Sequence, residues 1–116
     1  MKYKLKYSPD ASDKLRELNR QIKGNYGKTV ATRVTTKIMG EIRSLQELPE
    51  KGTSMEAMLG LPTPYRFLHV EQNYIFYRIE KDTIYVADIY NERENFLWRL
   101  FGVNLRTKDS MDFWGE

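Results

Sequence analysis

The first residues of the chain alternate between lysines and larger apolar side chains. Tyr3, Leu5 and Tyr7 occupy the odd positions, and each even position from 2 to 6 is a lysine. A period of two is typical of a strand with one buried face. We therefore predict a strand over residues 2–7, with its lysine side in water.

Two stretches with the period of a helix follow this strand. The Ser8–Asp10 segment suits a helix start, since its serine can cap free amides and its proline fits the first turn. Gly24 is expected to end this helix, and Pro49 to end a second one near Leu48. With only residues 25–27 between them, the helices are predicted to form an antiparallel hairpin. Their apolar stripes are Ala11, Leu15, Leu18 and Ile22, then Val30, Val34, Ile38, Ile42 and Leu45.

The second half of the chain predicts a sheet. Residues 50–64 form a loop with several glycines and prolines, although its methionines and leucines could pack on the body or form a short helical turn. β-Branched and aromatic residues then dominate three segments separated by polar turns, which is typical of a meander. The predicted strands are Tyr65–Glu71, Tyr74–Glu80 and Thr83–Tyr90.

A last helix is expected after the meander. Asn91 can cap it, and Glu94 three residues later completes a pattern similar to a capping box. Gly102 would end this helix, and residues 103–116 would form a mostly polar tail.

The element order β-α-α-β-β-β-α predicts an α+β fold in a single domain over residues 1–116. The economical architecture is a helical hairpin packed on one face of a small, mostly antiparallel sheet. Sheet twist would leave the opposite face concave and open to a ligand.

Composition narrows the classes of function. The 116 residues include no cysteine, which excludes disulfides, thiolate metal sites and a cysteine nucleophile. No stretch reaches the roughly 18 apolar residues of a membrane span, and the first residues lack the apolar run of a signal peptide. We therefore expect a cytoplasmic protein without a membrane partner.

The charge is unevenly distributed along the chain. The net charge is +3, but residues 1–48 hold 11 Lys or Arg against 5 Asp or Glu, whereas residues 49–116 hold 8 against 11. A basic half suits a nucleic-acid, ribosomal or acidic-protein partner. A solvated basic helix face would give the same count, so charge alone leaves both interpretations open.

Four short motifs, taken together, are similar to those of a known family. They are YRFLHV at 65–70, YIFYR at 74–78, IYNER at 89–93 and LFG at 100–102. Their order and spacing resemble the RelE/ParE superfamily of toxins from bacterial type II toxin–antitoxin systems, over residues 2–102. The resemblance implies a RelE/ParE-like fold and a toxin that arrests growth, with a possible role in plasmid stabilisation.

The resemblance also implies partners. A co-encoded antitoxin would neutralise the toxin by wrapping around it in a hetero-oligomer. The RelE-like branch of the superfamily cleaves mRNA in the ribosome, whereas the ParE-like branch inhibits DNA gyrase without known cleavage. The expected target is therefore either the ribosome with its mRNA or DNA gyrase.

Metal-free RNA cleavage needs a group that helps to deprotonate the 2′-hydroxyl, cations for the charged phosphorane and a donor for the leaving oxygen. In RelE-like toxins, arginines, lysines, tyrosines or histidines supply these groups. The resemblance implies a cationic part from Arg66, Arg78 and Arg93, and proton transfer or base stacking from His69, Tyr74, Tyr77 or Tyr90. No cofactor or metal is expected, since the carboxylates and the one histidine are too scattered for a metal site.

Strand periodicity ranks these candidates. Tyr77 shares its side with two isoleucines and is expected in the core, whereas Tyr74 and Arg78 share the other face. These two are the better candidates if that face is open. Arg66 could instead pair with a glutamate at a strand end, and His69 could be a structural or surface residue.

Two departures from the RelE-like pattern keep the branch open. Many mRNA-cleaving relatives carry an arginine at the position of Tyr74, and residues 96–99 offer no tyrosine or histidine as an acid. We predict ribosome-dependent mRNA cleavage, with ParE-like inhibition of gyrase as an alternative and a non-toxic, complex-forming relative as a third possibility.

Overall fold

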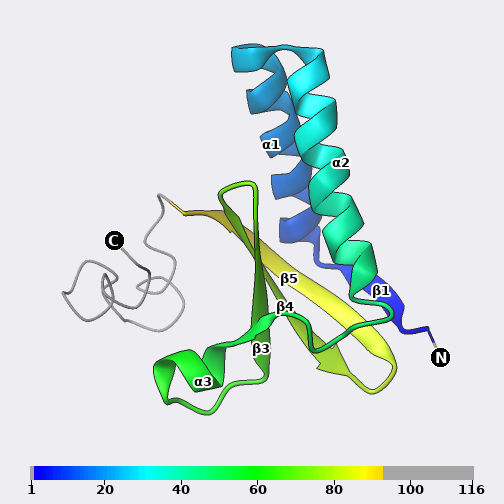
Figure 1. Ribbon diagram of the computed structural model, residues 1–116, viewed down its shortest axis with the longest axis vertical. Helices are drawn as coiled ribbons and strands as arrows, with labels where there is room; N and C mark the ends of the chain where they lie inside the picture. Colours follow the sequence, from blue (N-terminus) through cyan, green and yellow to red (C-terminus); the bar gives the residue numbers. More distant parts are fainter. Residues whose placement is uncertain (1, 93–116) are drawn as a thin grey trace.

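A computed structural model gives the structure of the chain and describes residues 2–92. The expected last helix and the tail at 103–116 lie outside the described residues. The helices and strands (Figure 1) are β1 (Lys4–Tyr7), α1 (Pro9–Tyr26), α2 (Lys28–Ser44), β2 (Thr53–Ser54), α3 (Met55–Leu59), β3 (Tyr65–Val70), β4 (Asn73–Glu80) and β5 (Thr83–Asn91).

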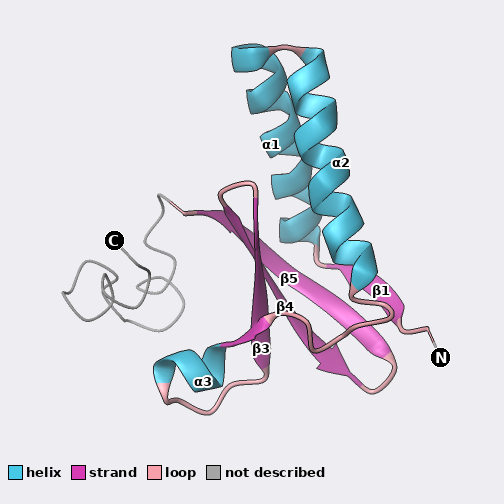
Figure 2. Cartoon of the chain, in the orientation of Figure 1, coloured by secondary structure: helices cyan, strands magenta, loops and turns pink. Residues whose placement is uncertain are grey.

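The strands form one sheet in the order β1-β5-β4-β3-β2. β1 runs parallel to β5, and the other neighbours are antiparallel. The α1–α2 hairpin packs on one face of the sheet (Figure 2). The predicted α+β fold is thus confirmed. The first strand of the chain, β1, pairs with the last described strand, β5.

The core lies between the hairpin and the sheet. Ile38 and Ile42 of α2 are fully buried, and they belong to one apolar cluster with Ile75 of β4 and Ile84 of β5. The hairpin is longer than this contact, so its distal end extends past the sheet (Figure 1). Within residues 2–92, no helix combines the length and the apolar character that crossing a lipid bilayer requires.

The joint between the two helices is tighter than the sequence predicts. The expected helix end at Gly24 is wrong, because α1 continues to Tyr26. Gly27 alone separates α1 from α2, and it takes φ +94° and ψ 169°. This backbone conformation is essentially restricted to glycine, so Gly27 is the residue that allows the chain to reverse.

α2 also ends earlier than predicted, at Ser44 instead of near Leu48. The Tyr3 amide donates to the carbonyl of Gln46 at 2.8 Å, and the Gln46 side-chain amide donates to the Tyr3 carbonyl at 2.9 Å. These contacts hold the chain against the start of β1, which explains why it leaves the helix before Pro49.

The start of α1 is fastened to the sheet through a β-bulge in β5. Phe76 faces Asp88 while Tyr77 faces Val86, so Ala87 is the additional residue of the bulge. The Ser8 hydroxyl donates to the Ala87 carbonyl at 2.6 Å and accepts from the Ala11 amide at 3.0 Å. Ser8 therefore caps the helix and binds the sheet at the same time.

Tyr77 fastens the loop that follows α2. Its hydroxyl donates to the Pro49 carbonyl at 2.8 Å and accepts from the Gly52 amide at 2.9 Å. A Cβ on Gly52 would lie 2.6 Å from this hydroxyl, so only glycine allows the approach. Tyr77 is fully buried, which confirms its expected place in the core. The loop also contains the short helix α3, in line with a helical turn in residues 50–64.

Candidate functional site

Most of the candidate residues lie on the sheet face turned away from the hairpin. The strand registers place on this side a set of mainly aromatic residues, and Met55 of α3 packs against them. We call this set the aromatic face. It consists of Tyr65, Phe67, His69, Tyr74, Phe76, Arg78, Tyr85 and Tyr90.

The centre of the aromatic face is buried, contrary to the expectation of an open face. Phe76 is 2% exposed, and Tyr74 and Tyr90 are each 7% exposed. The rings pack edge to face: the Phe67 and Tyr74 centroids lie 5.4 Å apart, and those of Phe76 and Tyr90 lie 6.0 Å apart. Such pairs stabilise a packed aromatic layer. Packing is therefore one role of Tyr74 and Tyr90.

Arg78 lies at one end of the aromatic face, where several neighbours hold its guanidinium. It pairs with Glu80, donates to the Tyr65 hydroxyl at 3.0 Å and stacks 4.2 Å from the Tyr85 ring centroid. The hydrogen bond to Glu80 raises the pKa of Arg78 above its ordinary value. The arginine is thus a fixed cation, already engaged by a carboxylate.

His69 lies at the other end of the aromatic face. Its Nε2 is 2.9 Å from Oε2 of Glu92, and its ring stacks on Tyr74 with centroids 4.7 Å apart. The His69 side chain is 48% exposed, so a ligand can reach it. A carboxylate at one ring nitrogen fixes the orientation of an imidazole, and an oriented imidazole suits proton transfer.

These two ends are well separated. Tyr74 and Arg78 are four residues apart on β4, which is about 13 Å along a strand. In the register of β3 and β4, His69 faces Tyr74 and Tyr65 faces Arg78. The structure therefore brings His69 and Tyr74 together and leaves Arg78 away from them.

The remaining arginine candidates do not join either end. Arg66 donates to the backbone carbonyls of Gly52 at 2.9 Å and of Glu50 at 3.4 Å, where it supports the loop beside Tyr77. It binds these carbonyls instead of the glutamate side chain that the sequence suggested. Arg93 lies outside the described residues.

A cation that sequence reasoning did not single out contacts the aromatic face. Lys14 of α1 lies 2.7 Å from Asp88 and places its ammonium 3.7 Å from the Tyr90 ring centroid. Lys14 belongs to the polar side of a helix, and no sequence pattern links it to a strand 74 residues later. The bulge at Ala87 and the short β1, which pairs only with residues 83–86, give it access to this part of β5.

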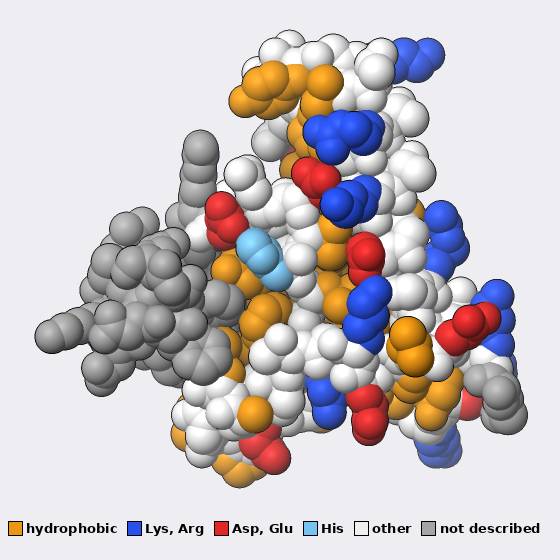
Figure 3. Space-filling view, viewed as in Figure 1, with side chains coloured by type: hydrophobic (Ala, Val, Ile, Leu, Met, Phe, Trp, Pro, Cys, Tyr) orange, Lys and Arg blue, Asp and Glu red, His pale blue; other side chains and the backbone are white. Residues whose placement is uncertain are grey.

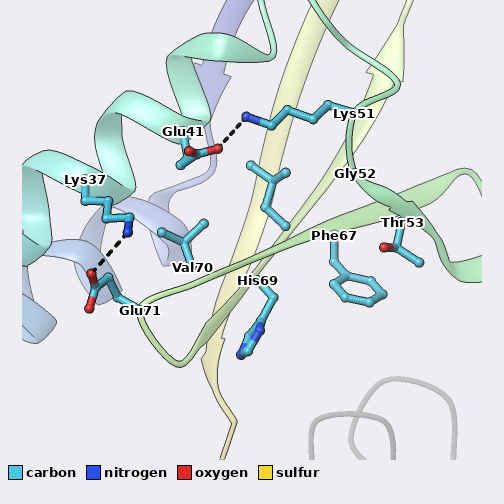
Figure 4. A pocket seen from close by; sticks show the side chains of 10 residues that line it. Lys37, Glu41, Lys51, Gly52, Thr53, Phe67, His69, Val70 and Glu71 are labelled. Carbon is cyan, nitrogen blue, oxygen red and sulfur yellow. Dashed lines mark hydrogen bonds and ion pairs between the residues drawn. The ribbon is translucent and has the colours of Figure 1, made fainter. Parts of the chain in front are cut away.

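A shallow groove of about 310 Å³ lies between α2 and the edge of β3 (Figure 4). Lys37 lies 3.8 Å from Glu71, and Lys51 pairs with Glu41, so these charges are balanced. β2 pairs only with Arg66 and Phe67, so among the described residues the edge at 68–70 has no strand neighbour. Such an edge can accept an extended peptide segment through backbone hydrogen bonds.

Within residues 2–92, no three histidine or carboxylate side chains come close enough together to hold a metal ion. Burial raises the pKa of Tyr77, which argues against this phenol as a base at neutral pH. Among the described candidates, His69 with its partner Glu92 is therefore better placed for proton transfer than Tyr77.

Comparisons with known proteins agree with this fold. Residues 5–96 match the model of a family described as the ParE toxin of the type II toxin–antitoxin system parDE. A chain in the solved structure of a chromosomal ParDE toxin–antitoxin system from P. aeruginosa superposes with a TM-score of 0.64 and 19% sequence identity. The match covers 77% of this chain and 95% of that chain. No curated protein matches the sequence.

Proposed function

The chain belongs to the ParE toxin family of type II toxin–antitoxin systems, and from this premise we propose that it arrests growth by inhibiting DNA gyrase without cleaving RNA. The single observation that supports this function best is the separation of Arg78 from His69 and Tyr74 on the aromatic face. The ParE-like branch of the superfamily is the one for which gyrase inhibition is expected.

The separation bears on the mechanism because RNA cleavage acts on one phosphate. At that one linkage the base must reach the attacking 2′-hydroxyl, the acid the leaving oxygen and the cation the phosphate oxygens, within about 3 Å for each hydrogen bond. Arg78 is about 13 Å along β4 from Tyr74 and is engaged by Glu80. Arg66 is engaged by two backbone carbonyls. An inhibitor that acts by binding needs no such convergence.

The proposed function includes an antitoxin partner. The open edge of β3 at residues 68–70 and the groove beside it would take an extended segment of that protein. Toxin and antitoxin would then form a hetero-oligomer in which the toxin is inactive.

Ribosome-dependent mRNA cleavage remains a second candidate function, because one observation favours it. His69 is half exposed, is oriented by Glu92 at 2.9 Å and stacks on Tyr74. An imidazole with a carboxylate partner could exchange a proton with a 2′-hydroxyl or a leaving oxygen. In that case Lys14, which lies over the ring of Tyr90 next to Tyr74, would have to supply the charge stabilisation, because Arg78 is about 13 Å from Tyr74 along β4.

One experiment separates the two functions. The purified chain is added in parallel to a gyrase supercoiling reaction and to a translation reaction with defined mRNA. We expect supercoiling to be blocked while the message stays intact, and His69→Gln to inhibit gyrase as well as the unsubstituted chain. Cleavage of the mRNA within codons, abolished by His69→Gln, would favour the enzyme instead. Uncut mRNA together with unhindered gyrase would contradict both functions and leave the non-toxic, complex-forming relative.

A further inference from the structure

The tip of the helical hairpin lies outside the apolar core of the described structure. It extends beyond the sheet (Figure 1), and every residue from 23 to 29 is exposed. Tyr26 is 71% exposed. We call the distal segment, residues 18–37, the basic arm.

The charge of the basic arm is of one sign. No aspartate or glutamate occurs between residues 18 and 40, and all the charged side chains there are cations. Figure 3 shows several blue, basic side chains along the hairpin. Arg20 pairs with Glu17, and Arg33 lies 3.4 Å from Glu71, which also attracts Lys37. Lys23 and Lys28 have no ion-pair partner within residues 2–92. The five cations are Arg20, Lys23, Lys28, Arg33 and Lys37.

The surface chemistry of the arm suits a phosphate backbone better than a protein. A protein interface usually has an apolar centre, but Tyr26 is the one large hydrophobic residue that is strongly exposed in the described part of the arm. The exposed surface between the cations carries hydroxyls, which donate readily to phosphate oxygens. These belong to Thr29, Thr32 and Thr36.

The dimensions of the arm also fit a nucleic-acid duplex. Lys28 and Lys37 are nine residues apart on α2, which corresponds to about 13.5 Å along the helix axis. Double-stranded DNA carries one charge per roughly 1.7 Å of its axis, so this span faces about eight phosphates. Several cations of the arm can therefore contact phosphates of one duplex at the same time.

We propose that the basic arm binds the phosphate backbone of double-stranded DNA, with Lys23, Lys28 and Tyr26 at the centre of the contact. The inference rests on the proposed function, because gyrase acts while it holds a DNA duplex. The toxin would then contact the DNA that gyrase holds as well as the enzyme, and its affinity for the complex would depend on salt.

The test uses the full chain and a fluorescent 20-base-pair duplex without gyrase, with binding measured by anisotropy from about 50 to 200 mM salt. The variant Lys23→Gln/Lys28→Gln is expected to bind about tenfold more weakly at low salt. Its log–log salt slope should be smaller by about 2, one for each lost phosphate contact. The matched control is Lys2→Gln/Lys6→Gln, which removes the same charge beside β1, and we expect it to bind like the unsubstituted chain.

Several results would overturn the inference. Equal losses of affinity in the two double variants would mean that DNA binding follows the net charge of the protein and is not located at the basic arm. Tighter binding to single-stranded RNA of the same length would assign the arm to RNA. Absence of duplex binding at 50 mM salt would remove the site altogether. Thermal unfolding of each variant confirms that a loss of binding is not a loss of fold.

A supercoiling assay with the same variants separates this inference from the proposed function. If both hold, Lys23→Gln/Lys28→Gln needs about tenfold more protein to block gyrase than the control does. Full inhibition of gyrase by this variant would contradict DNA binding by the basic arm and support the proposed inhibition of gyrase. Duplex binding that depends on Lys23 and Lys28, without inhibition of gyrase, would support DNA binding by the basic arm and contradict the proposed inhibition of gyrase.

Discussion

The two ends of the helical hairpin are built from the same two helices and serve different purposes. At the base, Ala11, Ile38 and Ile42 are fully buried against the sheet, and Ser8 binds the bulge of β5. At the distal end, residues 23–29 are all exposed and the charges are all positive. The difference indicates that the base determines stability, whereas the side chains of the tip contribute little to it.

The largest expected effect is at the base. Ile38→Ala removes a side chain that is fully buried between the hairpin and the sheet. We expect the free energy of unfolding to fall by about 2–5 kcal/mol, because the substitution loses apolar burial and leaves a cavity. Urea denaturation followed by circular dichroism measures this change. A loss below about 1 kcal/mol would show that the base is not the stabilising end.

The second effect tests whether the tip matters for stability through its backbone. Gly27→Ala forces an alanine into φ +94°, and we expect a loss of about 1–3 kcal/mol. Nothing lies within 4 Å of the added Cβ, so strain in the backbone is the only cause. Gly24→Ala is the matched control, since Gly24 lies inside α1 and alanine should stabilise that helix by about 0.5–1 kcal/mol. Similar changes in the free energy of unfolding for the two substitutions would contradict a positive φ at Gly27.

A smaller loss is expected at the start of α1. Ser8→Ala removes the helix cap and the hydrogen bond to the carbonyl of Ala87. The expected cost is about 1–2 kcal/mol, the upper part of the range for cap substitutions, because both bonds are lost. Differential scanning calorimetry would detect the lower Tm. Ser8→Thr keeps the hydroxyl and should recover part of the loss, and failure to do so would point to packing instead.

The smallest effect is predicted for the tip side chain. Tyr26→Ala should change the free energy of unfolding by less than about 0.5 kcal/mol, since the ring is 71% exposed. Tyr77→Phe, which removes a hydroxyl with two hydrogen bonds, should cost about 1–2 kcal/mol in the same denaturation assay. If Tyr26→Ala proved the more harmful of the two, the division between base and tip would be wrong.

The sequence predicted elements well where one local pattern was sufficient. The alternation of lysine and apolar residues predicted β1, which is shorter by two residues, and three aromatic segments predicted β3 to β5. The helix joint was harder, because Gly24 and Gly27 are both plausible stops. Only the backbone reversal distinguishes them, since Gly24 stays helical and Gly27 takes a positive φ.

The candidate site was less predictable, because its arrangement depends on contacts that are distant in sequence. Strand periodicity placed Tyr74 and Arg78 on one face, and the register agrees. It could not show that the centre of that face is buried, or that Glu80 engages Arg78. The contacts of Lys14 with Asp88 and Tyr90 depend on a bulge that has no sequence signature.

The pairing of β1 with β5 has a consequence for the order of events during synthesis. β5, the partner strand of β1, ends at residue 91. The ribosome must therefore add 84 residues after Tyr7 before this strand is complete. At roughly 5–20 residues per second, this delay is about 4–17 s. From the end of α2 at Ser44 until β5 is complete, the apolar stripes of the hairpin lack the full sheet that covers them. The nascent chain therefore acquires its folded surface only late in translation, and an antitoxin made in the same interval would meet it as it forms.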